Sequence, residues 1–157
     1  MKILVDTASQ KLTVSCDGKA LRTYLCSTSR WGIGNLSGSN KTPLGLHEVV
    51  EKYGDGVPVG GVFSSRRFTG EIVSPTRDDA PDGQDLITTR ILRLAGLQEG
   101  INKGGQVDSY ARYIYIHGTP EERRIGTPAS HGCVRMRNAD IIELYDMCPT
   151  GTLVEIV

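Results

Sequence analysis

Asp17-Gly18 constrains the fold most strongly, because this pair separates two short stretches of alternating apolar residues, 11–16 and 20–25. Such a pair is typical of a β-hairpin with a two-residue turn of the primed type. A similar stretch at 2–7 precedes it, so the chain is expected to open as a β-meander. The 19 glycines and 7 prolines among 157 residues also favour many turns and short strands over long helices.

The β pattern continues along the chain. Short or alternating apolar runs predict further strands at 46–53, 62–63, 71–73, 86–94, 111–117 and 152–157. A glycine-rich connection at 95–109 is long enough to be of the kind that is often functional. The run 75–84 holds three aspartates but lacks the ligand spacing and closing glutamate of a calcium loop, so it is interpreted as a loop.

One helix is expected near the C-terminus. Asn138 is a good N-cap, and apolar residues follow with helical spacing at Ile141, Leu144, Tyr145 and Cys148. Proline and glycine directly afterwards end it. No repeat or linker argues for a second domain, so residues 1–157 are predicted to form a single domain.

Charge narrows the range of partners. Lys+Arg 18 equals Asp+Glu 18, so no net field favours nucleic acid or an anionic membrane. The N-terminal apolar run ends at Asp6, well short of a secretory signal or a membrane span. The sequence as given is therefore expected to be cytoplasmic, or periplasmic if a leader has been removed.

The four cysteines form no CxxC pair, which is poor spacing for a zinc site or a redox dithiol. Disulfides are disfavoured in a reducing compartment. Cys16, Cys26 and Cys148 are interpreted as small buried residues. His47 is interpreted as a surface or strand histidine, and Ser65-Arg66-Arg67 as a solvated basic group.

The fourth cysteine lies in Ser130-His131-Gly132-Cys133-Val134-Arg135, and a second histidine, His117, ends the strand expected at 111–117. A free thiol titrates near 8.5, so it needs a neighbouring base to become a nucleophile at neutral pH, and both histidines are candidates. Gly132 permits a sharp turn, and the amides of Gly132 and Cys133 are candidate oxyanion donors. These residues fit acyl transfer.

Arg135 has a candidate role because side chains alternate along an extended strand. If 133–137 is extended, Val134 and Met136 face the core while Arg135 emerges on the side of Cys133, about 7 Å along. A guanidinium there would grip a carboxylate one residue beyond the attacked carbonyl. This predicts selection of a free chain end, as in a carboxypeptidase.

Three alternatives remain open from the residues alone. Cys133 and His131 would be structural if the thiol were buried and the imidazole satisfied in a turn. His117, His131 and Cys133 would suit zinc, but no fourth ligand suggests itself. A general papain-like protease would have a different order and context of Cys and His.

The same residues closely resemble the L,D-transpeptidase catalytic domain (YkuD-like) family, whose signature is a His followed downstream by Ser/Thr-His-Gly-Cys-x-Asn/Arg. The resemblance extends through most of the chain, including Ser27-Thr28, Thr42-Pro43-Leu44-Gly45, 113–118 and 135–140. Two departures concern acceptor choice more than the nucleophile: the interval from His117 to Ser130 is short, and Arg135 stands where many members have Asn.

The resemblance implies a mainly β fold, a β-sandwich of mixed sheets with one C-terminal helix and long loops. It implies that Cys133 attacks the carbonyl of an L-centre in a peptidoglycan stem tetrapeptide and expels the terminal D-amino acid, with His117 as base. The Gly118 carbonyl would orient the imidazole, and His131 and Gly132 would shape the thiolate environment and the oxyanion hole. Ser130 and Arg135 are the candidate substrate-binding residues, and no cofactor or metal is expected.

The resulting thioester can be resolved by water or by an amine. The chain resembles short, leaderless members associated with cytosolic muropeptide recycling, so an L,D-carboxypeptidase acting on a tetrapeptide or muropeptide is expected. An L,D-transpeptidase that cross-links or exchanges D-amino acids is the first alternative, and a non-catalytic stem-peptide binder is the second. Covalent inhibition by carbapenems is also expected.

Overall fold

The computed structural model describes residues 1–75 and 85–157. Within them the chain forms β1 (Lys2–Asp6), β2 (Lys11–Cys16), β3 (Lys19–Leu25), β4 (Gly45–Tyr53), β5 (Gly61–Ser64), β6 (Arg67–Ile72), β7 (Ile87–Gly96), β8 (Tyr115–Gly118), β9 (Val134–Met136) and β10 (Leu153–Ile156). The helix α1 (Asn138–Met147) and two 3-10 turns, η1 (Gly105–Val107) and η2 (Glu122–Arg124), complete the described elements. The loop predicted at 75–84 lies, apart from Pro75, outside the described residues.

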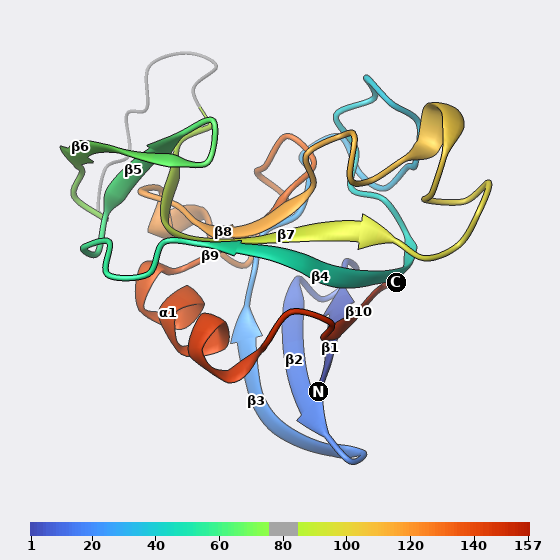
Figure 1. Cartoon of the computed structure of the whole chain (residues 1–157), viewed down its shortest axis with the longest axis horizontal. Coiled ribbons are helices and arrows are strands. Elements are labelled where there is room, and N and C mark those ends of the chain that lie inside the picture. The colour runs from blue at the N-terminus through green and yellow to red at the C-terminus, as the bar shows by residue number, and fades with distance from the viewer. Residues whose placement is uncertain (76–84) are drawn as a thin grey trace.

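The strands form one mixed sheet in the order β3-β2-β1-β10-β4-β7-β5-β6, and β8 and β9 continue from β7. The pairs β1–β10 and β8–β9 are parallel, and the other pairs are antiparallel. Figure 1 shows β1, β2 and β3 running across the direction of β4 and β7, so that the sheet folds over itself. The mainly β fold with mixed strands and one helix is as predicted.

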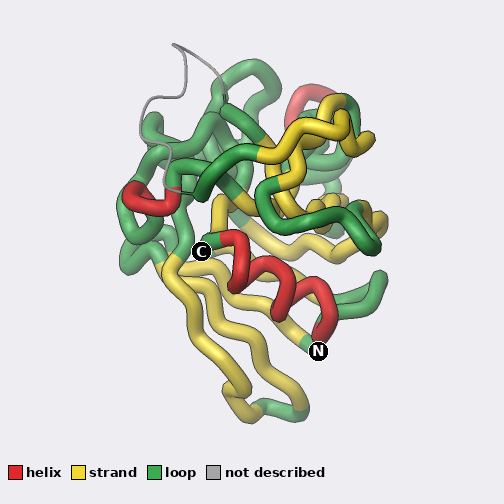
Figure 2. Tube along the Cα trace, turned by 90° about the vertical axis from the view of Figure 1, so that its left-hand side faces the viewer, coloured by secondary structure: helices red, strands yellow, loops and turns green. Residues whose placement is uncertain are grey.

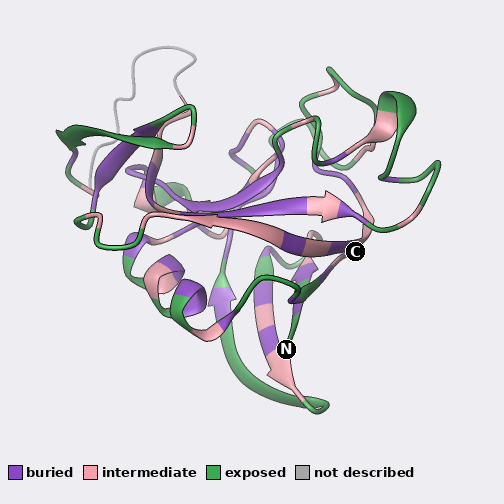
Figure 3. Ribbon diagram, viewed as in Figure 1, coloured by how far each residue is buried: buried purple, intermediate pink, exposed green. Residues whose placement is uncertain are grey.

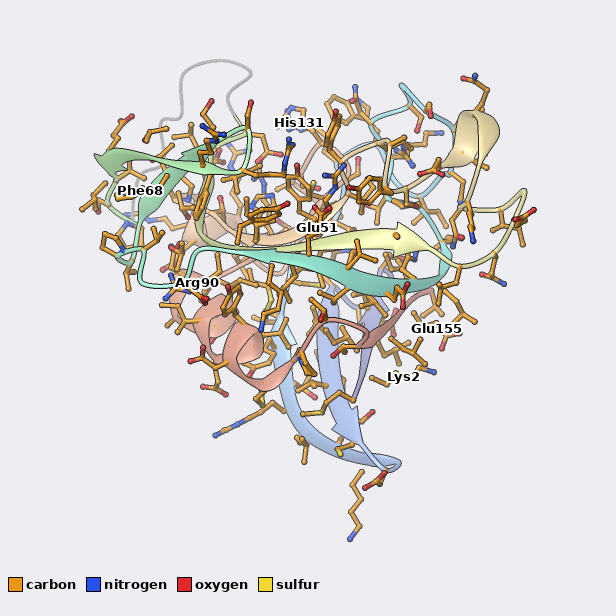
Figure 4. All side chains as sticks on the ribbon, in the orientation of Figure 1. Lys2, Glu51, Phe68, Arg90, His131 and Glu155 are labelled. Atoms are coloured by element: carbon orange, nitrogen blue, oxygen red, sulfur yellow. The ribbon has the colours of Figure 1, made fainter. Side chains whose placement is uncertain are left out.

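The opening hairpin is confirmed. Asp17 and Gly18 connect β2 to β3 with φ values of 50° and 78°, and a positive φ at both turn positions is the requirement of a primed turn. Figures 1 and 2 show this hairpin projecting away from the rest of the molecule. β3 is correspondingly exposed along most of its length (Figure 3).

The main core lies between α1, the opening strands and one face of β7, β8 and β9. Its members include Leu92 and Leu94 of β7, Ile116 of β8 and Val134 and Met136 of β9. Figure 2 shows α1 lying against the sheet, and Figure 3 shows β7 and β8 among the most buried strands. The described residues include no helix with the length and apolarity needed to cross a membrane.

Several element boundaries differ from prediction, and two of them lie near the candidate site. β8 begins at Tyr115, four residues later than predicted, because 108–113 forms a turn in which Tyr113 has a φ of 56°. Asn138 is the first helical residue rather than the N-cap, which is Arg137. The Asn138 side chain instead bonds Thr88 at 2.6 Å and the carbonyl of Thr119 at 2.9 Å, deep in the core.

The remaining cysteines and His47 are largely as predicted. All four cysteines are free, Cys26 and Cys148 are fully buried, and Cys16 is half-buried. His47 lies in β4 as expected of a strand histidine, but it is fully buried rather than at the surface. Arg66 is half-buried rather than freely solvated, since it donates to the Tyr115 hydroxyl at 3.2 Å.

Candidate active site

Backbone groups hold the Cys133 thiol at the start of β9. β9 pairs in parallel with β8, with Ile116 opposite Val134, so Cys133 lies beside Tyr115. The amide of Tyr115 donates to Sγ at 3.3 Å, and Sγ lies 3.3 Å from the Tyr113 carbonyl, to which the thiol donates. The late start of β8 therefore matters to the site, because the turn before it supplies the Tyr113 carbonyl.

His117 occupies the same face of the sheet as Cys133. Residues two apart in β8 point the same way, so His117 shares the face of Tyr115, beside which Cys133 lies. Its Nδ1 is 2.6 Å from the carbonyl of Gly118. Because a carbonyl only accepts, Nδ1 carries the proton and Nε2 keeps its lone pair. Nε2 is buried and has no hydrogen-bond partner among the described residues.

Gly118 must be a glycine for this contact to form. A Cβ built on it would lie 2.6 Å from the Thr88 carbonyl oxygen and 2.7 Å from the side-chain oxygen of Asn138. These distances are below any normal contact, so a side chain here would push β8 away from β7. The carbonyl that fixes the His117 tautomer is therefore positioned by close packing of the backbone.

Ser130 and Gly132 shape the turn that precedes Cys133. Gly132 has a φ of 130°, which favours glycine. The buried Ser130 hydroxyl accepts the Gly132 N–H at 3.2 Å and donates to the Cys133 carbonyl at 2.5 Å. In this structure Ser130 thus closes the turn, and the Gly132 amide has an internal acceptor. The oxyanion and substrate-binding roles stay predictions.

His131 points to a different neighbourhood from His117. Its Nδ1 is 3.3 Å from Asp85 Oδ2, and its ring meets Trp31 edge to face at 5.1 Å between centroids. Together with Cys133 it lines a pocket of about 220 Å³, whose other walls are Ser37, Gly38, Asn40, Ala111, Arg112 and Ile114. The structure therefore places His131 in the wall of the pocket that opens at the thiol.

The predicted exposure of the Arg135 side chain toward a substrate requires a correction. Its neighbours Val134 and Met136 do face the core as the alternation predicts, but the side chain of Arg135 is only 2% exposed. The guanidinium forks around one Asp85 oxygen, Oδ1, to which Nη2 donates at 2.7 Å and Nε at 3.0 Å, and Glu121 lies 3.9 Å from Nη1. A guanidinium held in this way is not presented to a substrate carboxylate in this structure.

Asp85 is the principal site residue that sequence reasoning missed. It contacts both Arg135 and His131, and the pKa of its carboxyl is lowered. Burial works in the opposite direction, but it is outweighed by the positive charge that His117 would carry if protonated and by the charge and hydrogen bond of Arg135. Its only sequence signal was its place just before the strand expected at 86–94, and nothing local linked it to a partner 50 residues away.

Thr42 was also missed as an individual residue. It is fully buried, donates to the Gly132 carbonyl at 3.0 Å and accepts the Ser29 amide at 2.9 Å. Ser29 in turn forms an isolated bridge with Ser130. The Thr42-Pro43-Leu44-Gly45 motif, which is part of the family resemblance, thus contributes a residue that supports the turn before Cys133.

The protonation states follow from burial. Burial, with the carboxylate of Asp85, raises the pKa of Cys133 to about 12, against the opposing effects of the Tyr115 amide and nearby arginines. Burial also lowers the pKa of His117, although Asp85 and the Gly118 carbonyl oppose this. The resting pair is therefore a thiol and a neutral imidazole whose free nitrogen is available as a base. Across residues 1–75 and 85–157, no three His, Cys, Asp or Glu residues group as metal ligands.

A thiol and a neutral imidazole on one face of a sheet, beside a pocket, are the groups that a cysteine acyl-transferase uses. Comparison with known proteins agrees. The L,D-transpeptidase catalytic domain model (YkuD) matches residues 1–156. The chain therefore belongs to the L,D-transpeptidase catalytic domain family.

Relatives in this family resemble the chain over most of its length. The probable L,D-transpeptidase YbiS of Escherichia coli K12 is 30% identical over 164 residues, covering 99% of this chain and 47% of that protein. The putative L,D-transpeptidase YqjB of Bacillus subtilis is 44% identical over 159 residues, covering 85% of this chain and 84% of that protein. The chain thus spans about half the length of the E. coli relative.

Solved structures support the fold. L,D-transpeptidase 3 from Mycobacterium tuberculosis, in complex with a faropenem-derived adduct, has a TM-score of 0.62 at 18% identity, covering 98% of this chain and 58% of that one. L,D-transpeptidase LdtMt1 in complex with imipenem has a TM-score of 0.59 at 19% identity, covering 99% of this chain and 57% of that one.

Proposed function

We propose that this domain is a cysteine-dependent L,D-carboxypeptidase that removes the terminal D-amino acid from peptidoglycan stem tetrapeptides. The observation that carries the proposal is the buried Nε2 of His117, which keeps its lone pair and lies on the same sheet face as Cys133. Family membership supports the substrate class. A role in muropeptide recycling and a cytoplasmic location stay predictions, which cell fractionation would test.

The chemistry proceeds in two halves. The Cys133 proton passes to Nε2 of His117 as Sγ attacks the carbonyl carbon before the terminal residue. The C–N bond then breaks, the leaving amine takes the proton from Nε2, and a thioester remains. Water attacks the thioester, His117 accepts its proton, and the tripeptide carboxylate and the free thiol are released.

The deciding experiment is incubation of the protein with a disaccharide tetrapeptide, followed by product masses. We expect the tripeptide and a free D-amino acid. Finding only cross-linked dimer, or only exchange of an added D-amino acid, would show that an amine rather than water resolves the thioester. That outcome is the L,D-transpeptidase alternative, which the names of the relatives favour.

A second measurement separates an enzyme from a non-catalytic stem-peptide binder. We expect a carbapenem to add its mass to the intact protein, because relatives have been solved with imipenem and with a faropenem-derived adduct. Cys133→Ala should abolish the adduct. A wild-type protein that binds tetrapeptide but forms no adduct and releases no product would be a binder.

A further inference from the structure

The pocket beside Cys133 contains one arginine, Arg112, and Arg135 is not among its walls. Arg112 lines it together with His131 and Cys133, and no acidic residue is among the walls. Arg112 is half-buried, and within the described part of the chain no carboxylate lies within ion-pair distance of it. Arg135, by contrast, is neutralised by Asp85. Among the described residues, the Arg112 charge in this pocket therefore has no counterion.

The Arg112 guanidinium is held in place by neutral acceptors. It donates to the carbonyl of Lys41 at 2.6 Å and to that of Gly34 at 3.3 Å. The Lys41 carbonyl also lies 3.4 Å from the position that a Cβ on Gly132 would occupy, so this loop touches the turn before the nucleophile. Carbonyl partners orient a guanidinium without cancelling its charge, which leaves it able to bind an anion.

The electrostatic influence of Arg112 reaches the thiol. Arg112 opposes the rise in the pKa of Cys133, and an ionised Cys133 would in turn stabilise the charged guanidinium. A carboxylate in this pocket would thus lie near both the reacting sulfur and a fixed positive charge. A peptide that ends one residue beyond the attacked carbonyl carries such a carboxylate.

We propose that Arg112, rather than Arg135, binds a carboxylate of the acyl-donor peptide in the pocket that it shares with Cys133. Arg112 is then a specificity-determining residue that favours donors with a free carboxylate next to the scissile bond. This inference rests on the proposed function for its substrate. Two carboxylates of the acyl-donor peptide have the required chemistry, the C-terminal α-carboxylate and a side-chain carboxylate of the preceding residue. We assign the α-carboxylate as the group that Arg112 binds.

The first test does not need turnover. Iodoacetate and iodoacetamide both alkylate the Cys133 thiolate with loss of iodide, but only iodoacetate carries a carboxylate. Peptide mapping after reaction gives the iodoacetate to iodoacetamide rate ratio at Cys133. We expect Arg112→Gln to lower this ratio about tenfold and Arg112→Lys to lower it less. Arg22→Gln, which removes an exposed guanidinium from β3, should leave it unchanged.

A purely structural role for Arg112 would slow both reagents equally and leave the ratio unchanged, which would overturn the proposal. Salt provides a check without any variant, because added salt should slow iodoacetate but not iodoacetamide in the wild-type protein. Equal insensitivity of both reagents to salt would also contradict the proposal. If Arg112→Gln does not fold, Arg112→Lys and the salt series still decide.

The second test uses peptides. We expect Arg112→Gln to lower kcat/KM for the tetrapeptide about tenfold more than for its C-terminally amidated analogue. An analogue amidated only on the side chain of the preceding residue should retain the full effect. If that analogue loses it instead, the side-chain carboxylate is the ligand. Absence of any wild-type turnover would overturn the proposed function, while the alkylation ratio would still judge Arg112.

Discussion

The two faces of β8 and β9 differ in kind although they alternate residue by residue. On one face Ile116, Val134 and Met136 join the main apolar core. On the other, His117, Cys133 and Arg135 bring a base, a thiol and a buried charge together. One face of this short strand pair thus packs into the core, and the other carries the candidate catalytic side chains.

The two faces are held by different contacts. The candidate catalytic side chains lie on or next to strands whose opposite face packs into the core, so packing as well as hydrogen bonds sets their positions. His117 is further restrained by the Gly118 carbonyl, and Cys133 by the Tyr115 amide. We therefore expect substitutions on the face of His117 and Cys133 to lower activity, and substitutions on the core face to lower stability.

The largest expected effect is a loss of activity, and it comes from the face that carries His117 and Cys133. His117→Gln should lower the rate of Cys133 acylation by about 10²–10⁴-fold, because it removes the base proposed to take the Cys133 proton, while unfolding changes little. Met136→Ala, on the opposite face of the same sheet, should cost about 2–5 kcal/mol of stability yet leave the folded fraction able to acylate. Rates of carbapenem adduct formation and urea unfolding curves measure both. Similar losses of activity in the two variants would break the comparison.

A smaller effect is expected from the carboxylate that neutralises Arg135. Asp85→Asn should destabilise the protein by about 3 kcal/mol, because it leaves a buried guanidinium without its counterion. It should also lower the pKa of Cys133, since Asp85 raises it. Urea unfolding and the pH dependence of iodoacetamide alkylation at Cys133 check the two parts.

Glu121→Gln is the matched control for Asp85→Asn. Glu121 lies 3.9 Å from Arg135, against 2.7 Å for Asp85, and its closer partner is Arg124 at 3.0 Å, so its loss should destabilise the protein less than Asp85→Asn does. Equal destabilisation by the two substitutions would show that the fork between Asp85 and Arg135 is not the dominant contact. An unchanged alkylation profile in Asp85→Asn would refute its electrostatic role.

The sequence could predict what depends on neighbours along the chain. Alternation correctly assigned Val134 and Met136 to the core, and the hairpin at Asp17-Gly18 followed from turn chemistry alone. The strand before His117 was also predicted, although its first residues were wrong. A positive φ at Tyr113 was not foreseeable there, because nothing in the residue type requires it.

What the sequence could not predict are contacts between distant segments. Arg135 was expected to face a substrate, and only the folded chain shows that Asp85, which lies just before β7, pairs with its guanidinium. Asn138 was interpreted as a cap because Asn commonly caps helices, but β7 brings Thr88 close enough to use its amide group. Both errors have one cause, since a polar side chain was assigned a local partner when its tertiary partner lay about 50 residues away.

The smallest expected effect at neutral pH is on stability, and it comes from His47, the second buried histidine. His47 differs from His117 in that both ring nitrogens have partners, Nε2 at 2.8 Å from the Ser109 hydroxyl and Nδ1 at 3.0 Å from the Gly45 carbonyl. Burial lowers the pKa of His47 to about 4, with the nearby Arg112 charge acting in the same direction and the Gly45 carbonyl against it. It is therefore buried as a neutral, satisfied group.

The pH dependence follows from the sign of this shift. In the unfolded chain His47 binds a proton near pH 6.5, whereas in the folded protein it stays neutral until about pH 4. The free energy of unfolding therefore falls as the pH drops between these values. The loss amounts to roughly 3 kcal/mol at most. His47→Gln should flatten urea-unfolding stability between pH 6.5 and 5, above the range in which most carboxylates titrate. An unchanged slope in this variant would show that His47 is solvated, and would leave His117 as the buried histidine that governs acid stability.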